Sequence, residues 1–158
     1  MNTNWEILKD KIYYTDDGSF RDIFVLDTEL KDWEKWIDFV NTNYEVEFYN
    51  GIAEKTEIKI NKNIAIGYLN KKNDLSINAS IKLNGIIIKC YFFCIDEIDN
   101  DIMPKEINSM SDHNILIDYF NNVSALLNKK IILTDGNCST DRLELISIEN
   151  NKVTINLN

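Results

Sequence analysis

The pattern of hydrophobic and polar positions is clearest between residues 75 and 95. Apolar and polar side chains alternate from Leu75 to Leu83, which is the two-residue period of a β-strand with one face in water. Asn84 and Gly85 follow, and this pair favours the positive φ angles of a type I′ turn. The segment 86–95 after the turn is almost continuously apolar, as expected of a strand buried on both faces. The pattern predicts a β-hairpin whose second strand is the central strand of a sheet.

Other segments with strand character lie on both sides of this hairpin. They are rich in β-branched and aromatic residues and are separated by Asn, Asp, Gly and Ser, which favour turns. The predicted strands are 11–15 and 20–26 as a first hairpin, 44–49, 56–60, 131–134, and 143–148 and 152–157 as a terminal hairpin. The segment 63–69 fits either a strand or a short helix, because its length does not decide between them.

Two segments have the three-to-four-residue apolar spacing of an amphipathic helix. The first runs from about residue 29 to residue 41, after Asp27 and Thr28, whose side chains can accept hydrogen bonds from the free N–H groups of a helix start. The second begins at Ser111 or Asp112, and its apolar face extends to Leu127. Both helices are long enough to cover one face of a sheet.

The order of these elements is strands, helix, strands, helix, strands. This order is typical of an α+β protein with a mainly antiparallel sheet, because parallel α/β folds alternate strictly between strand and helix. A chain of 158 residues fits one domain and can bury roughly 70% of its unfolded surface. We therefore expect residues 1–158 to form a single α+β domain, with a sheet built from hairpins and two covering helices.

The charge balance narrows the classes of partner. The chain has 17 basic and 26 acidic residues, a net charge of −9 and a sequence pI near 4.6. An acidic surface repels phosphate backbones and anionic membranes, so we expect no nucleic-acid and no membrane binding, and a basic protein is the favoured partner.

The N-terminal residues have no signal-peptide pattern, and no segment has the ~18 apolar residues of a membrane helix. We expect a cytoplasmic protein of undetermined oligomeric state.

No residue pattern specifies a reaction, a cofactor or a metal. His113 is the single histidine, and its place at the start of the second predicted helix favours a surface residue of the first helical turn over a catalytic one. Cys90 and Cys94 fall on one predicted strand, roughly 13 Å apart at the usual rise, and with Cys138 are interpreted as buried thiols. A hydrolase that uses scattered carboxylates stays an alternative, because such residues need proximity in space and not in sequence.

The acidic segment 96–101 is the main candidate for a binding surface. Asp96, Glu97, Asp99 and Asp101 follow the apolar strand and precede Pro104, so we expect an exposed loop. Such a loop can be simply solvated, can contact a basic partner or can hold a metal ion, although the spacing of an EF-hand is absent. The hypothesis extends this surface to the polar side of the first helix, with the residues Glu29, Asp32, Glu34, Trp36 and Asp38. Trp36 lies one step off the apolar stripe, as either a half-buried packing residue or an interface anchor.

Three segments carry a resemblance to a known class of proteins. The segment 17–25 with the sequence DGSFRDIFV, Asp32 and Trp33 in the first helix, and the segment 126–134 with the sequence LLNKKIILT resemble small acidic bacterial proteins encoded beside polymorphic or contact-dependent toxins. The resemblance implies an immunity protein, which binds one cognate toxin domain and blocks it. It identifies no binding residues in this chain. An adaptor subunit of another complex is a further alternative.

Overall fold

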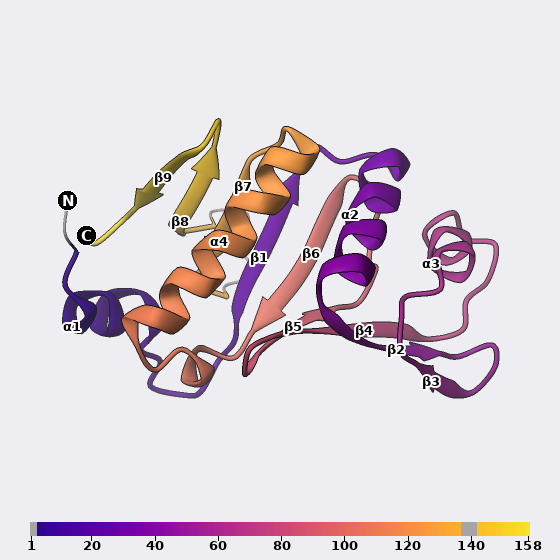
Figure 1. Cartoon of the computed structure of the whole chain (residues 1–158), viewed down its shortest axis with the longest axis horizontal. Coiled ribbons are helices and arrows are strands. Elements are labelled where there is room, and N and C mark those ends of the chain that lie inside the picture. The colour runs from indigo at the N-terminus through magenta and orange to yellow at the C-terminus, as the bar shows by residue number, and fades with distance from the viewer. Residues whose placement is uncertain (1–2, 137–141) are drawn as a thin grey trace.

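The computed structural model describes residues 3–136 and 142–158. Within these residues one nine-stranded sheet carries helices on one of its faces (Figure 1). The helical elements are α1 (Trp5–Leu8), a π-helix (Lys9–Tyr13), α2 (Leu30–Asn43), α3 (Lys62–Leu69), a 3₁₀-helix (Pro104–Glu106) and α4 (Met110–Leu127). The strands are β1 (Arg21–Leu26), β2 (Glu45–Asn50), β3 (Lys55–Glu57), β4 (Ile77–Leu83), β5 (Ile86–Cys90), β6 (Glu97–Ile102), β7 (Ile131–Thr134), β8 (Glu144–Glu149) and β9 (Lys152–Ile155).

All the strand pairs are antiparallel, and their order in the sheet is β3-β2-β4-β5-β6-β1-β7-β8-β9. The predicted turn between β4 and β5 has positive φ angles at Asn84 and Gly85, and the β8–β9 turn has them at Asn150 and Asn151. These residue types tolerate this backbone region at low cost. The expected α+β class with a mainly antiparallel sheet is confirmed.

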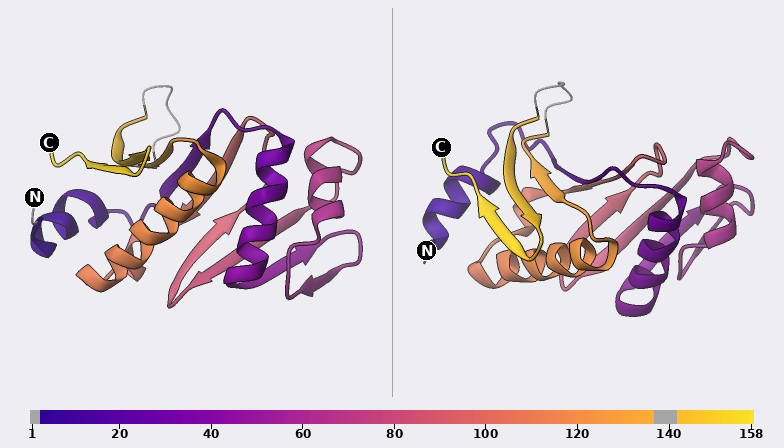
Figure 2. Two further views of the ribbon diagram at one scale, coloured as in Figure 1. Left: turned by 45° about the horizontal axis from the view of Figure 1, so that its top comes forward. Right: turned by 90° about the horizontal axis from the view of Figure 1, so that it is seen from above.

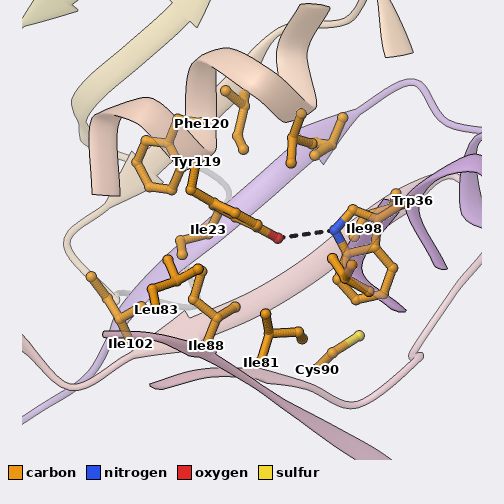
Figure 3. Close-up of a cluster of buried hydrophobic side chains, with 14 of the residues drawn as sticks. Ile23, Trp36, Ile81, Leu83, Ile88, Cys90, Ile98, Ile102, Tyr119 and Phe120 are labelled. Carbon is orange, nitrogen blue, oxygen red and sulfur yellow. Dashed lines mark hydrogen bonds between the residues drawn. The ribbon is translucent and has the colours of Figure 1, made fainter. Parts of the chain in front are cut away.

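Helices α2 and α4 lie on the same face of the sheet, as the two turned views show (Figure 2). The strands send alternate apolar side chains toward these helices, and the core forms between the two layers. Trp36 on α2 and Tyr119 on α4 meet over the sheet, where the indole Nε1 donates a hydrogen bond of 3.0 Å to the Tyr119 hydroxyl (Figure 3). This bond links the two helices inside the core.

Several expectations about strands are wrong. Residues 11–15 do not form a strand of a first hairpin, because Lys9–Tyr13 form a π-helix after α1. The strand predicted at 86–95 ends at Cys90, and β6 rather than β5 is the middle strand of the nine. For segment 63–69, where strand and helix were both open, the structure shows the helix α3. In the described part of the chain, no helix has the length and apolar character needed to cross a membrane.

The second long helix begins earlier than the sequence predicts. Its N-cap is Ser109, whose side chain accepts a hydrogen bond from the Asp112 backbone N–H. His113 therefore lies inside the first turn and is buried rather than on the surface, with its Nδ1 2.7 Å from the Tyr13 hydroxyl. Burial lowers the pKa of His113, which favours the neutral imidazole.

Candidate functional site

The face of the sheet opposite α2 and α4 carries the candidate site. On β6, Ile98 and Ile102 are fully buried in the core, while Asp99 and Asp101 alternate with them and are partly exposed. Successive side chains of a strand point to opposite faces, so both aspartates lie on the face away from the helices. The expectation of an exposed acidic loop at 96–101 is wrong, because these carboxylates belong to the middle strand of the sheet.

Strand pairing brings a third carboxylate to the same place. Asp22 on β1 lies directly opposite Asp101 on β6, and Phe24 lies opposite Asp99. Like charges directly opposite each other on neighbouring strands destabilise a sheet. The Oδ1 atom of Asp101 is buried and has no hydrogen-bond partner among the described residues. The three aspartates thus form a cluster of like charges on two neighbouring strands.

Two adjoining hollows of about 200 and 310 Å³ follow this cluster along the open face. They share Tyr91 and Asp101 and together form what we call the open-face groove. The smaller hollow is otherwise lined by Phe20, Ile87, Lys89, Met103 and Glu106. The larger hollow is otherwise lined by Asp22, Phe24, Phe93, Asp99 and Arg142.

The groove has an apolar rim that water can reach. Phe93 is 68% exposed, Phe20 46% and Met103 39%. The rings of Tyr91 and Phe93 stack on each other with centroids 5.5 Å apart and an angle of 18° between their planes. A contiguous set of large apolar side chains in water, beside polar ones, marks a binding surface more often than it marks ordinary surface.

Two basic side chains line the groove, those of Lys89 and Arg142, and Arg142 forms an ion pair with Glu97. Arg142 donates hydrogen bonds of 2.9 and 3.2 Å to the two carboxylate oxygens of Glu97. Its guanidinium carbon lies 3.8 Å from the centre of the Phe24 ring. Lys89 lies opposite Asp101 on β5, and its positive charge offsets part of the rise that burial causes in the pKa of that carboxyl. Among the described lining residues, four acidic side chains face two basic ones, so the groove keeps an excess of negative charge.

Burial raises the pKa values of the three aspartates, and the excess of negative charge adds to the effect for Asp99 and Asp101. Burial, followed by repulsion from Asp22, Glu97 and Asp101, raises the pKa of Asp99 to about 7. Burial and the charge of Asp22 raise the pKa of Asp101 to about 6. Burial also raises the pKa of Asp22, against the attraction of Arg142. A cation bound in the groove would favour the ionised carboxylates and lower all three pKa values.

The other residues predicted to bind a partner lie apart from the groove. Glu29, Glu34 and Asp38 are exposed on or next to α2, on the helical side of the sheet, and Asp38 pairs with Lys62. Asp32 is buried at the start of α2, where it accepts a hydrogen bond from the Glu29 backbone N–H and lies 3.7 Å from Lys129. These four residues therefore do not share a surface with Asp99 and Asp101.

Trp36 offers no surface to a partner, because its side chain is fully buried. Its position one step off the apolar stripe is explained by the second helix, since α4 packs on that side of α2 and Tyr119 accepts the indole N–H. Asp96 is exposed just before β6, and Glu97 is the ion-pair partner of Arg142. Of the predicted acidic segment, Asp99 and Asp101 line the groove.

The structure describes two of the three cysteines, and Cys138 lies outside the described residues. Cys90 is fully buried, as expected of a core thiol. Cys94 is partly buried and lies after the end of β5, so the two do not share a strand. Within the described chain, no group of three or more His, Cys, Asp or Glu side chains is arranged to hold a metal ion.

Sequence reasoning missed Asp22, Tyr91 and Phe93. The signal for the aromatic pair was present in the alternation of residues 87–93, where every second side chain faces the open side. The pairing of Asp22 with Asp101 left no such signal, because it depends on which strands become neighbours.

No family model matches this chain, and neither do any curated proteins or solved structures.

Proposed function

We propose that this protein is an immunity protein, which binds a cognate toxin domain and neutralises it, and that the open-face groove is its binding surface. The observation that carries the proposal is the groove itself, where a cluster of carboxylates lies beside exposed aromatic rings, on the sheet face opposite α2 and α4. The net charge of −9 supports a basic partner, such as a nuclease-type toxin. The resemblance described for residues 17–25 and 126–134 points to the same class.

Such a surface suits recognition of one protein. Aromatic side chains contribute large contact areas and are common among the residues that dominate binding energies. Charged groups around them speed the encounter with an oppositely charged partner and select against the wrong one. The groove places its aspartates on strands β1 and β6, whose backbones are fixed by the sheet, and its exposed rings directly before β1 and after β5.

The test has two steps. The tagged protein is first used to capture partners from its own cells at low and at high salt, and captured proteins are identified by mass spectrometry. The captured protein is then expressed in a test host with and without this chain. The proposal expects one basic protein that is toxic alone and harmless when this chain is present. A captured partner that is not toxic would instead indicate an adaptor subunit and would contradict neutralisation.

Matched variants connect the result to the groove. Asp99→Asn with Asp101→Asn removes two charges from the groove, and Glu34→Gln with Asp118→Asn removes two exposed charges from the helical side. Above about pH 8, where the carboxyls of Asp99 and Asp101 are ionised, both double variants have the same net charge. We expect the groove variant to lose rescue and the helix variant to keep it.

A second candidate is a hydrolase that uses carboxylates as acid and base. The specific observation in its favour is the raised pKa of Asp99 and Asp101, since an acid that keeps its proton near neutral pH can protonate a leaving group. Hydrolysis of chromogenic esters, phosphoesters and glycosides by the purified chain, lost in the Asp99→Asn and Asp101→Asn variant, would favour this candidate. Absence of hydrolysis together with rescue from a captured toxin favours immunity.

A further inference from the structure

The groove already contains one example of how it holds a cationic group. Arg142 lies on the Phe24 ring at 3.8 Å while it donates two hydrogen bonds to Glu97. A guanidinium is planar, is weakly hydrated and has paired N–H groups, so it can stack on a ring and bind a carboxylate at the same time. One end of the groove thus binds a guanidinium of the chain itself.

The same hollow contains two more carboxylates, those of Asp99 and Asp101, while Arg142 directs its hydrogen bonds to Glu97. The Oδ1 atom of Asp101 is buried without a hydrogen-bond partner among the described residues. Asp99 and Asp101 line the same hollow as the stacked rings of Tyr91 and Phe93. Repulsion among the aspartates would be relieved by one additional positive charge. Lys89 faces Asp101 from β5, but it does not form an ion pair with it.

We propose that the open-face groove receives an arginine side chain of the partner, held by the carboxylates of Asp99 and Asp101 beside the exposed aromatic rings. This inference rests on the proposed function, because it describes the partner that the immunity protein would recognise. A second copy of this chain does not fit the groove, since each copy would bring a surface of the same negative charge. The occupant is therefore a basic segment of another protein with an arginine at its centre.

Arginine is favoured over lysine for two reasons. A guanidinium can rest its plane on an aromatic ring and still bind a carboxylate through two N–H groups, while an ammonium acts as a compact, strongly hydrated charge. The groove also offers its rings beside its carboxylates, as it does for Arg142. A lysine would use the charge of the groove and little of its aromatic surface.

The test uses the full chain labelled with ¹⁵N and ¹³C and three small probes. These are N-acetyl-arginine methylamide, the lysine analogue and the citrulline analogue, which has nearly the shape of arginine without its charge. Two-dimensional NMR follows the backbone signals and the side-chain carboxyl signals. We expect saturable shifts near Asp99, Asp101 and Tyr91 with the arginine probe, weaker binding of the lysine probe and no binding of the citrulline probe.

Two variants and the pH dependence of binding test whether the carboxylates of Asp99 and Asp101 hold the arginine probe. The Asp99→Asn and Asp101→Asn variant should bind the arginine probe at least tenfold more weakly, while the Glu34→Gln and Asp118→Asn variant should bind as the parent chain does. Bound arginine should lower the pKa of Asp99, so affinity should rise as the pH is raised from about 5 to about 8. The other groups that face Asp99 and Asp101 are Asp22, Glu97, Lys89 and Arg142, and the variants leave these unchanged.

Four results would overturn the inference. They are absence of arginine binding, equal binding of citrulline, shifts confined to another surface, and tighter binding of Ca²⁺ or Mg²⁺ at the same carboxylates. None of them affects the capture and rescue on which the immunity proposal rests. Conversely, arginine binding in the groove without any neutralised toxin would leave this inference standing and contradict the proposed function.

Discussion

Asp22, Asp99 and Asp101 lie on adjacent strands, and they are ionised only at a cost in folding free energy. The raised pKa values of Asp99 and Asp101 mean that the folded chain holds protons that the unfolded chain releases near pH 4. The free energy of unfolding therefore falls as the pH rises from the ordinary carboxyl pKa toward about 7, where Asp99 becomes ionised. Clusters of carboxyls whose ionisation lowers the stability of the folded chain are typical of binding sites.

Replacing the two β6 aspartates should remove that cost. We expect the Asp99→Asn and Asp101→Asn variant to match the parent chain near pH 4 and to be more stable above pH 7, by on the order of 1 kcal/mol because both carboxyls are partly screened by water. Urea unfolding at a series of pH values measures the difference. The Glu34→Gln and Asp118→Asn variant serves as the control, and a difference that does not grow with pH would contradict the prediction.

The hydrogen bond between Trp36 and Tyr119 should be sensitive to loss of a single atom. Tyr119→Phe removes the hydroxyl and leaves the buried indole N–H without its acceptor, so we expect a loss of about 1–3 kcal/mol in the free energy of unfolding. The same substitution at Tyr49, whose side chain is 38% exposed, should change stability little. Equal effects of the two substitutions in urea unfolding would show that the bond does not matter.

At the scale of single elements, the sequence predicts those whose apolar period is strong. The spacing of Leu30, Trp33, Ile37 and Val40 gives α2, and the alternation through residues 75–83 gives β4. Strand β6 was missed because its composition is polar, although Ile98 and Ile102 alternate with carboxylates in the period of a strand. Its third inward residue is Asn100, which is buried in the core.

The sequence predicts Ser111 or Asp112 as the cap of α4, two or three residues after the observed cap, and this difference can be tested. Ser109 caps the helix through the Asp112 N–H at 3.1 Å, while Ser111 is exposed in the first turn. Ser109→Ala should lower the free energy of unfolding by about 1 kcal/mol. Ser111→Ala should have almost no effect, because alanine is a good helix former. The opposite order of the two variants in thermal or urea unfolding would place the cap where the sequence alone suggested.

At the scale of the whole molecule, the sheet order decides where charge is concentrated. Asp22 and Asp101 are 79 positions apart in the sequence, and they become neighbours because β1 joins β6 in the middle of the sheet. A sequence pattern gives the strands but does not give this order. Composition could therefore predict an acidic protein, but it could not predict which acidic residues gather on the open face.

Net charge and local charge make different predictions for the association rate. If the total of −9 steers a basic partner, the groove and helix double variants should slow association equally above about pH 8, where both lose two charges. If the groove guides docking, the groove variant should associate more slowly and its rate should depend less on salt. We expect the second result in stopped-flow measurements with the captured partner between low and physiological salt, because charges separated by more than the ~8 Å Debye length are largely screened there. Parallel salt dependences for the two variants would place docking on another surface.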